Sequence, residues 1–190
     1  MIKKQIKYIL VIILTGVFFM SSCSPIKDRF SKLLMTGDEK TSMNRLEQVL
    51  EAIENKDNNA LKSLFSQEAL NETENFEKDI NALFEFFQGK VISKEKSDGP
   101  TVFDSIDGGK RRQKISSYFY IQTEKQKYFI LMDDFPIDTF NPDNEGLYLI
   151  LLVKAEDEEK IWDENEKILY DIVNGEIIDI PHSGIYIPYQ

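Results

Sequence analysis

The sequence predicts an α+β fold in which N-terminal helices pack on one face of a curved antiparallel sheet and form a cone. Apolar residues recur every three or four positions from residue 41 to residue 87, which is the period of helices with one buried face. After Gly89 the period changes to two, which is typical of half-buried strands. Helices grouped before strands indicate an α+β domain rather than an alternating α/β domain.

The N-terminus has the pattern of a secretory signal. Residues 1–7 contain three lysines and no acid, and residues 8–20 are apolar except for Thr15 and Gly16. The apolar run is shorter than the ~20 residues that a transmembrane helix needs. We therefore expect an export signal rather than a membrane span.

The apolar run ends in the tetrapeptide MSSC, whose last residue is Cys23. It resembles the lipobox of bacterial lipoproteins, which implies that residues 1–22 are removed and that a lipid on Cys23 anchors the chain to the outer face of the cell membrane. The alternatives are an idle thiol and a residue of an uncleaved anchor. Residues 23–40 are expected to be a lipidated tether, either a short helix on the membrane surface or a linker, and residues 41–190 a single domain. Cys23 is the only cysteine, so we expect no disulfide framework.

The charge of the chain argues against some partners. The formal net charge is −10, and it becomes more negative when the three lysines of residues 1–22 are removed. Nucleic acid is not expected as a partner, because its phosphates need a basic surface. Hydrophobic residues make up 42% of the chain and aromatic residues 12%, which indicates a globular protein rather than a disordered one.

Three helices are expected before the strands. The first begins near Thr41, with its apolar face formed by Met43, Leu46, Val49, Leu50 and Ile53. Asp57 is expected to cap a short second helix. For the third, Asn71 and Glu74 have the spacing of a capping box, and Gly89 stands where a left-handed C-terminal cap is expected.

The strands are separated by turn residues, of which Asp107, Gly108 and Gly109 give the clearest hairpin signal. The segment 156–174 is acidic and favours neither a helix nor a strand, and residues 184–188 are either a docked edge or a tail. The expected strands are residues 90–97, 101–106, 110–123, 127–135 and 147–155.

Several segments resemble a Gram-positive lipoprotein family of unknown function, domain-of-unknown-function family 5104. They are NNALKSLFS at 58–66, FFQGKVIS at 86–93, SDGP at 97–100, SID at 105–107, NPDNEGLY at 141–148 and GIYIP at 184–188. The family in turn resembles the nuclear transport factor 2-like, cystatin-like superfamily, which implies the same cone of helices on a curved sheet. That superfamily contains both enzymes and binding domains, so the fold does not select a function. The family assigns no catalytic residue.

The candidates for catalysis are few. Asp133 and Asp134 follow an apolar strand, and a burial-raised pKa would let one of them act as a general base in a cone pocket. The favoured interpretation is that the strand ends there and both side chains are solvated. His182 is the only histidine, and no sequence feature brings it close to a carboxylate.

Metal and cofactor sites are not expected. With a single histidine and no cysteine left after lipidation, a zinc site is improbable. The oxygen-bearing residues from Asp138 to Glu145 lack the order of a calcium loop, and turn formation explains them better. No sequence motif indicates a cofactor.

The aromatic residues Tyr118, Tyr120, Tyr128 and Trp162 are candidates for lining a ligand pocket, although packing on the helices is the commoner role. The leading hypothesis is a non-catalytic binding or interaction domain for an unknown small ligand or envelope protein. One alternative is a cone-fold isomerase or hydrolase that uses Asp133 or Asp134. Another is a purely structural lipoprotein that docks on an envelope protein.

Overall fold

The computed structural model describes residues 35–162, 172–173, 176–177 and 183–187. The chain divides into two units, residues 1–40 and residues 41–190, and the sheet belongs to the second. The helices are α3 (Gly37–Glu54), α4 (Asn58–Leu64), α5 (Gln67–Glu72) and α6 (Phe76–Phe86), and the 3-10 helices are η1 (Pro142–Asn144) and η2 (Ala155–Ile161). The strands are β1 (Val91–Lys96), β2 (Thr101–Asp107), β3 (Lys110–Thr123), β4 (Lys127–Asp138), β5 (Gly146–Lys154), β6 (Ile172–Val173), β7 (Glu176–Ile177) and β8 (Gly184–Tyr186).

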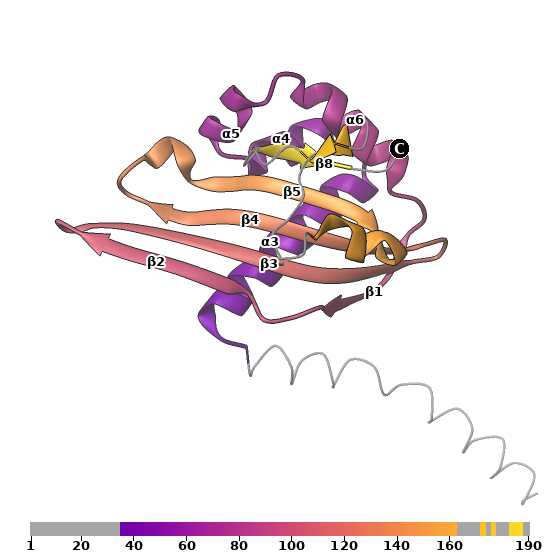
Figure 1. The fold of residues 1–190 in the computed structure, drawn as a ribbon, viewed down its shortest axis with the longest axis horizontal. Helices are drawn as coiled ribbons and strands as arrows, with labels where there is room; N and C mark the ends of the chain where they lie inside the picture. Colours follow the sequence, from indigo (N-terminus) through magenta and orange to yellow (C-terminus); the bar gives the residue numbers. More distant parts are fainter. Residues whose placement is uncertain (1–34, 163–171, 174–175, 178–182, 188–190) are drawn as a thin grey trace, which may run out of the picture. The chain divides into compact units, whose positions relative to one another are not determined.

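The α+β class is confirmed, with the helices before the main strands and on one face of the sheet (Figure 1). α3 buries the apolar stripe that the sequence predicted, including Leu46, Val49 and Leu50. α4 begins after Asp57, whose side chain accepts a hydrogen bond from the Ala60 amide at 2.9 Å. This cap is also as predicted.

The third predicted helix is wrong at its start, because the chain forms two helices there. Ser66 caps α5 by accepting a hydrogen bond from the Ala69 amide, and Asn71 lies inside that helix rather than at its beginning. The chain leaves α5 at Thr73, whose hydroxyl donates to the Ala69 carbonyl at 2.8 Å and also lies 3.2 Å from the Ser183 carbonyl. Thr73 and Ser183 are 110 residues apart in the sequence, so local periodicity does not reveal their contact.

The main sheet has six strands in the order β1-β3-β4-β5-β8, and β2 pairs with the other half of β3. Residues 119–123 of β3 pair with β1, and residues 110–116 pair with β2. The pairings among β1 to β5 are antiparallel as predicted, but β8 runs parallel to β5, so the sheet is mixed. The closing segment is therefore a docked edge strand.

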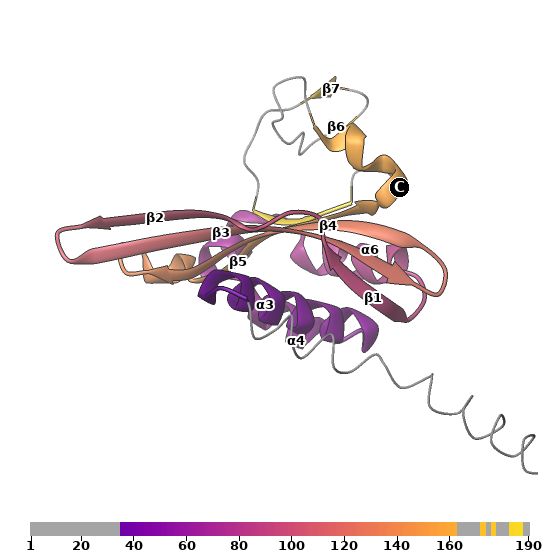
Figure 2. The same cartoon turned by 90° about the horizontal axis from the view of Figure 1, so that it is seen from below.

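The two faces of the sheet carry different clusters of side chains. Figure 2 shows the sheet edge-on, with α3, α4 and α6 on one side, which we call the inner face. The inner cluster fills the space between helices and sheet with residues such as Phe119, Ile130 and Ile150. The opposite, outer face carries a smaller cluster that includes Phe129 and Ile161, the last residue of η2.

Gly146 marks the closest approach between the helices and the sheet. Its φ is +126°, and a Cβ atom there would lie 2.9 Å from the Ser66 amide nitrogen. That amide donates to the Leu147 carbonyl at 2.9 Å, which joins the α4–α5 junction to the start of β5. Only glycine combines this backbone conformation with this contact at low cost.

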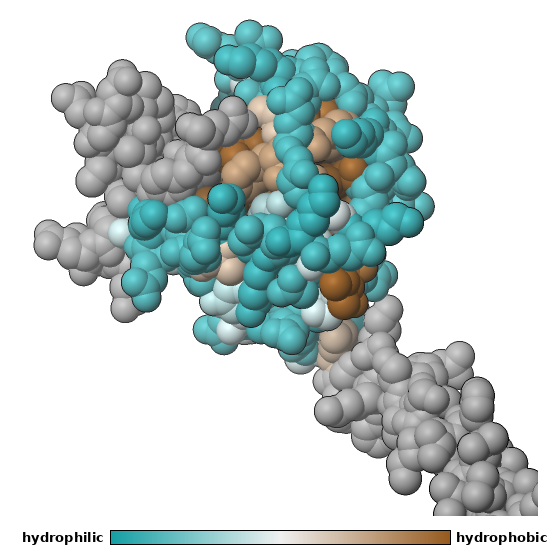
Figure 3. Space-filling view, turned by 90° about the vertical axis from the view of Figure 1, so that its right-hand side faces the viewer, coloured by the Kyte–Doolittle hydropathy of each residue, from teal (hydrophilic) through white to brown (hydrophobic). Residues whose placement is uncertain are grey.

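The face of the molecule drawn in Figure 3 is mainly hydrophilic. Figure 3 shows apolar residues gathered in patches that hydrophilic residues surround. Within the described ranges, the exposed large apolar side chains are Ile92, Phe103, Ile106 and Phe140. No helix in the described part of the chain combines the length and the apolar character needed to cross a membrane.

Candidate functional site

Four aromatic side chains meet on the outer face of the sheet. Tyr118 and Tyr120 are two residues apart on β3, so both point to this face, and Tyr120 is paired with Phe129 of β4. Trp162 follows η2 and packs on the same cluster. The ring centroids of Tyr118 and Trp162 lie 6.4 Å apart, and those of Phe129 and Trp162 lie 6.5 Å apart. These rings form one aromatic wall.

This wall borders a cavity of about 440 Å³, which we call the outer-face cavity. Its volume lies within the range of about 300–1,000 Å³ that is usual for small-ligand sites. Aromatic rings supply the apolar side, and short polar or acidic side chains supply the rest. The lining residues are Ser97, Asp98, Thr101, Tyr118, Phe129, Glu158 and Trp162.

Hydrogen bonds join the segments that surround the outer-face cavity. The Ser97 amide donates to the Tyr118 carbonyl at 3.0 Å, which holds the β1–β2 connection against β3. The Tyr120 hydroxyl donates to Glu158 Oε2 at 2.5 Å, which holds η2 over the sheet. Lys127 Nζ lies 4.4 Å from the centroid of the Tyr120 ring. The β1–β2 connection and η2 are therefore each joined to β3 by a hydrogen bond.

The charged side chains that line the cavity are acidic. Asp98 and Glu158 are acidic, and none of the seven lining residues is basic. Burial raises the pKa of the Tyr118 hydroxyl above its usual value, a hydrogen bond with Thr101 opposes this, and the nearby charges of Asp133 and Asp98 raise the pKa further. For Tyr120, the hydrogen bond to the Glu158 carboxylate is the main cause of a raised pKa.

The fourth aromatic candidate, Tyr128, lies on the inner face, away from the outer-face cavity. Its side chain is 1% exposed and its ring stacks on Phe87 with centroids 4.9 Å apart. Its hydroxyl accepts from the Gln88 amide at 2.8 Å and donates to the Phe86 carbonyl at 3.0 Å. Tyr128 thereby joins the end of α6 to β4, which is a role in the core. Tyr120 belongs to the aromatic wall but is not among the residues that line the cavity.

Asp133 and Asp134 do not end the strand, and the interpretation that both are solvated is wrong. β4 continues to Asp138, and the two residues are 5% and 4% exposed. Asp133 accepts from Ser116 Oγ at 2.5 Å and pairs with Lys114 Nζ at 2.7 Å. These partners come from β3, which sequence periodicity alone does not align with β4.

Asp134 points to the inner face and pairs with Arg45 of α3. Arg45 Nε donates to Oδ2 at 3.1 Å. Nη2 lies 3.1 Å from Oδ1 but outside hydrogen-bonding geometry, so this buried oxygen has an ion pair without a hydrogen bond. Burial raises the pKa of Asp134, although Arg45 opposes the shift. Neither aspartate is among the residues that line the outer-face cavity.

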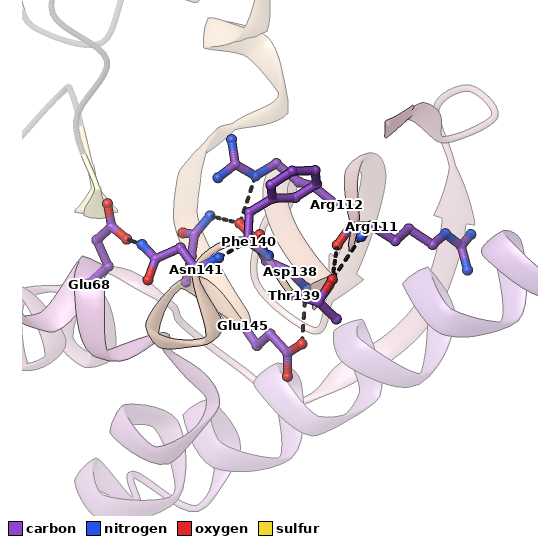
Figure 4. A network of polar contacts seen from close by, with 9 residues as sticks. Glu68, Arg111, Arg112, Asp138, Thr139, Phe140, Asn141 and Glu145 are labelled. Atoms are coloured by element: carbon purple, nitrogen blue, oxygen red, sulfur yellow. Dashed lines mark hydrogen bonds and ion pairs between the residues drawn. The ribbon is translucent and has the colours of Figure 1, made fainter. Parts of the chain in front are cut away.

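The oxygen-rich β4–β5 loop is organised around Asp138, whose side chain is fully buried (Figure 4). Asp138 Oδ1 accepts from the Phe140 and Asn141 amides, and Oδ2 accepts from Asn144 Nδ2 and from Arg112 Nε. Desolvation acts to raise the pKa of Asp138, but these donors outweigh it and the pKa is lowered. The carboxylate thus joins the residues of the turn to one another and to β3.

Other predicted positions fall outside the described part of the chain. They are Cys23, in residues 1–34, and His182, in residues 178–182. Within the described ranges, no group of three or more His, Cys, Asp or Glu side chains is arranged to hold a metal ion.

Five lining residues of the outer-face cavity were not predicted from the sequence. Phe129 lies in the expected strand 127–135, and Glu158 belongs to the acidic segment that favours neither a helix nor a strand. Asp98 lies between the expected strands 90–97 and 101–106. No sequence signal brings the turn after β1 next to η2, because the two are about 60 residues apart and only the sheet places them together. The remaining two unpredicted residues are Ser97 and Thr101.

Comparison with known proteins identifies one family. The family model described as "Domain of unknown function (DUF5104)" matches residues 48–155, which is more than half of the chain. The matched range contains β1 to β5 and five of the cavity-lining residues, while Glu158 and Trp162 lie just beyond it. No curated protein matches the sequence.

Proposed function

This chain belongs to the family described as domain of unknown function (DUF5104). From the sequence that ends at Cys23 and from the outer-face cavity, we propose that it is a membrane-anchored extracytoplasmic lipoprotein that binds a small ligand without catalysis. The outer-face cavity is the observation that carries the binding role. Tyr118, Phe129 and Trp162 offer apolar surface, and Asp98 and Glu158 offer charged groups that orient a ligand.

The construction of the cavity supports binding. Tyr118 and Phe129 are on the long paired strands β3 and β4, so their positions do not depend on a loop. Glu158 is held by the Tyr120 hydroxyl. A site whose groups are already in place loses little conformational entropy when a ligand enters.

The anchoring role is supported by the sequence MSSC ending at Cys23 and by the basic, then apolar, segment before it. The test is fractionation of cells that express the native chain or the Cys23→Ala variant. We expect the native protein in the membrane fraction and the variant released from it. A Cys23→Ala protein that still partitions fully with membranes contradicts lipid anchoring through this residue.

The binding role is tested by native mass spectrometry of the full-length protein purified under mild conditions. We expect a copurifying small molecule on the native protein and on Ser105→Trp, whose exposed side chain on β2 is outside the cavity. Thr101→Trp, on the same strand, places an indole in the cavity and should lose the molecule. Equal occupancy of both variants would place the ligand elsewhere, and a bare native protein with no thermal shift in a metabolite panel would argue against small-molecule binding.

Catalysis by Asp133 or Asp134 is the alternative. The raised pKa of Asp134 is the property that a general base needs. We favour binding over catalysis because each aspartate is already neutralised by a basic partner, Lys114 or Arg45. A turnover abolished by Asp134→Asn in a protein that remains folded would reverse this preference.

A further inference from the structure

The side chains that line the outer-face cavity limit the class of ligand that it can bind. We propose that it binds a small organic amine in its protonated form, with the ammonium group near Asp98 and Glu158 and the apolar body against the aromatic wall. This inference rests on the binding role proposed above and specifies the ligand class for the same site.

The first argument is the charge of the lining. Asp98 and Glu158 are the ionisable acids of the cavity, and no lysine or arginine is among its seven lining residues. Asp98 Oδ1 accepts from its own turn at the Gly99 amide, and Glu158 Oε2 accepts from Tyr120. Each carboxylate keeps a second oxygen for which no hydrogen bond to the described residues is present. An anionic ligand would be repelled, whereas an ammonium group supplies three donors.

The second argument is the aromatic wall. Tyr118 and Trp162 are half-buried, so both rings can offer surface to a ligand. Aromatic faces attract cations. One such contact is present on this face of the sheet, where Lys127 Nζ lies 4.4 Å from the Tyr120 ring centroid. The same rings bury apolar surface, so an amine with an aromatic or aliphatic body satisfies both parts of the cavity.

The third argument is the field around the site. Two lysines near this face have acidic partners, since Lys114 of β3 pairs with Asp133 and Lys160 of η2 pairs with Asp157. The charges of Asp133 and Asp98 both act on the Tyr118 hydroxyl in the direction that disfavours a further negative charge. Lys127 is held over Tyr120 and does not line the cavity. The cavity therefore favours a cation over a neutral ligand of the same shape.

The test compares 2-phenylethylamine with 2-phenylethanol, which have nearly the same shape but differ in charge at neutral pH. Trp162 is the only tryptophan of the chain and lines the cavity, so its fluorescence reports occupancy directly on the full-length protein. Calorimetry gives the affinities. We expect the amine to bind at least about tenfold more tightly than the alcohol, and the difference to shrink at high salt.

Two variants locate the interaction, and one matched variant controls for net charge. Glu158→Gln and Asp98→Asn keep an oxygen acceptor but remove a charge, and each should weaken amine binding several-fold without affecting the alcohol. Glu156→Gln changes the same residue type on the same 3-10 helix, but Glu156 is exposed and outside the cavity. We expect it to leave amine binding unchanged.

The outcomes separate this inference from the proposed function. Equal affinity for amine and alcohol overturns the cation inference and leaves the binding role in place. No binding of either compound to the cavity overturns the inference and removes support from the binding role. The control peptide is Gly-Lys-Gly with an acetylated N-terminus and an amidated C-terminus, so that its only ammonium group is the lysine side chain. If it binds more tightly than 2-phenylethylamine, the ammonium group belongs to a protein side chain, and the small-molecule assignment is overturned.

Discussion

Replacement of Asp138 by asparagine tests whether a buried carboxylate holds the β4–β5 loop. The fully buried side chain receives four hydrogen bonds, two on each oxygen. Asparagine keeps Oδ1 as an acceptor for the Phe140 and Asn141 amides. Its amide nitrogen would face the donors Arg112 Nε and Asn144 Nδ2, so two hydrogen bonds to a charged acceptor are lost.

Each hydrogen bond to a charged group contributes about 1.5–3 kcal/mol, so the loss would be about 3–6 kcal/mol. We reduce this to about 2–4 kcal/mol because the Arg112 side chain is 47% exposed and only a short loop covers the site. The assay is urea unfolding followed by circular dichroism, with a lower midpoint and an unchanged slope. Asp104→Asn is the matched control, since Asp104 also pairs with an arginine, Arg111, but on the surface, and it should change stability much less.

The pH dependence gives a second check on Asp138. Its pKa is lower in the folded protein than in the unfolded chain, so its stabilisation is complete above the unfolded value of about 3.9 and is lost as pH falls through the folded pKa. The stability difference between the native protein and Asp138→Asn should therefore shrink in acid. A loss below about 1 kcal/mol at neutral pH, or a difference independent of pH, would refute the role assigned to this carboxylate.

Three further predictions concern the helix–sheet contacts and the core. Gly146→Ala should lower the free energy of unfolding in urea by about 2 kcal/mol or more. The new Cβ atom would lie too close to the Ser66 amide, and alanine disfavours the positive φ of this position. An unchanged midpoint would contradict this contact. Arg45→Met should lower the free energy of unfolding by about 2–4 kcal/mol, because it leaves Asp134 buried without its ion-pair partner. The loss should grow as pH rises, because burial already raises the pKa of Asp134 and removal of Arg45 raises it further. A loss independent of pH would refute this account. Burial raises the pKa of Tyr148 to about 12, so an absorbance titration should show one phenol that ionises after the others and is absent in Tyr148→Phe. The free energy of unfolding should fall above about pH 10, because tyrosine ionises there in the unfolded chain but not yet at Tyr148 in the folded protein.

The fold class could be predicted from the sequence because it depends on local periodicity. An amphipathic helix such as α3 and an alternating strand such as β3 each show their buried face in the order of their residues. The cap at Asp57 was predictable for the same reason, since it involves an amide only three residues away. Tyr118 and Trp162 were found as pocket candidates by residue type alone.

The tertiary structure decided the features that depend on distant partners. α5 ends at Thr73, which contacts Ser183, and β4 continues through Asp133, which meets Lys114 on the neighbouring strand. Two adjacent aspartates indicate the end of a buried strand only when no cation is close enough to pair with them. The sequence does not show which residues become neighbours in the fold.

The sequence by itself thus determined that helices are grouped before strands and that the chain is acidic. Only the tertiary structure brought Asp98 and Glu158 to one cavity beside Trp162. The physical reason is that periodicity encodes which side of an element is buried, whereas a binding site is formed by pairings between elements. Those pairings are selected by the packing of the whole domain rather than by any one segment.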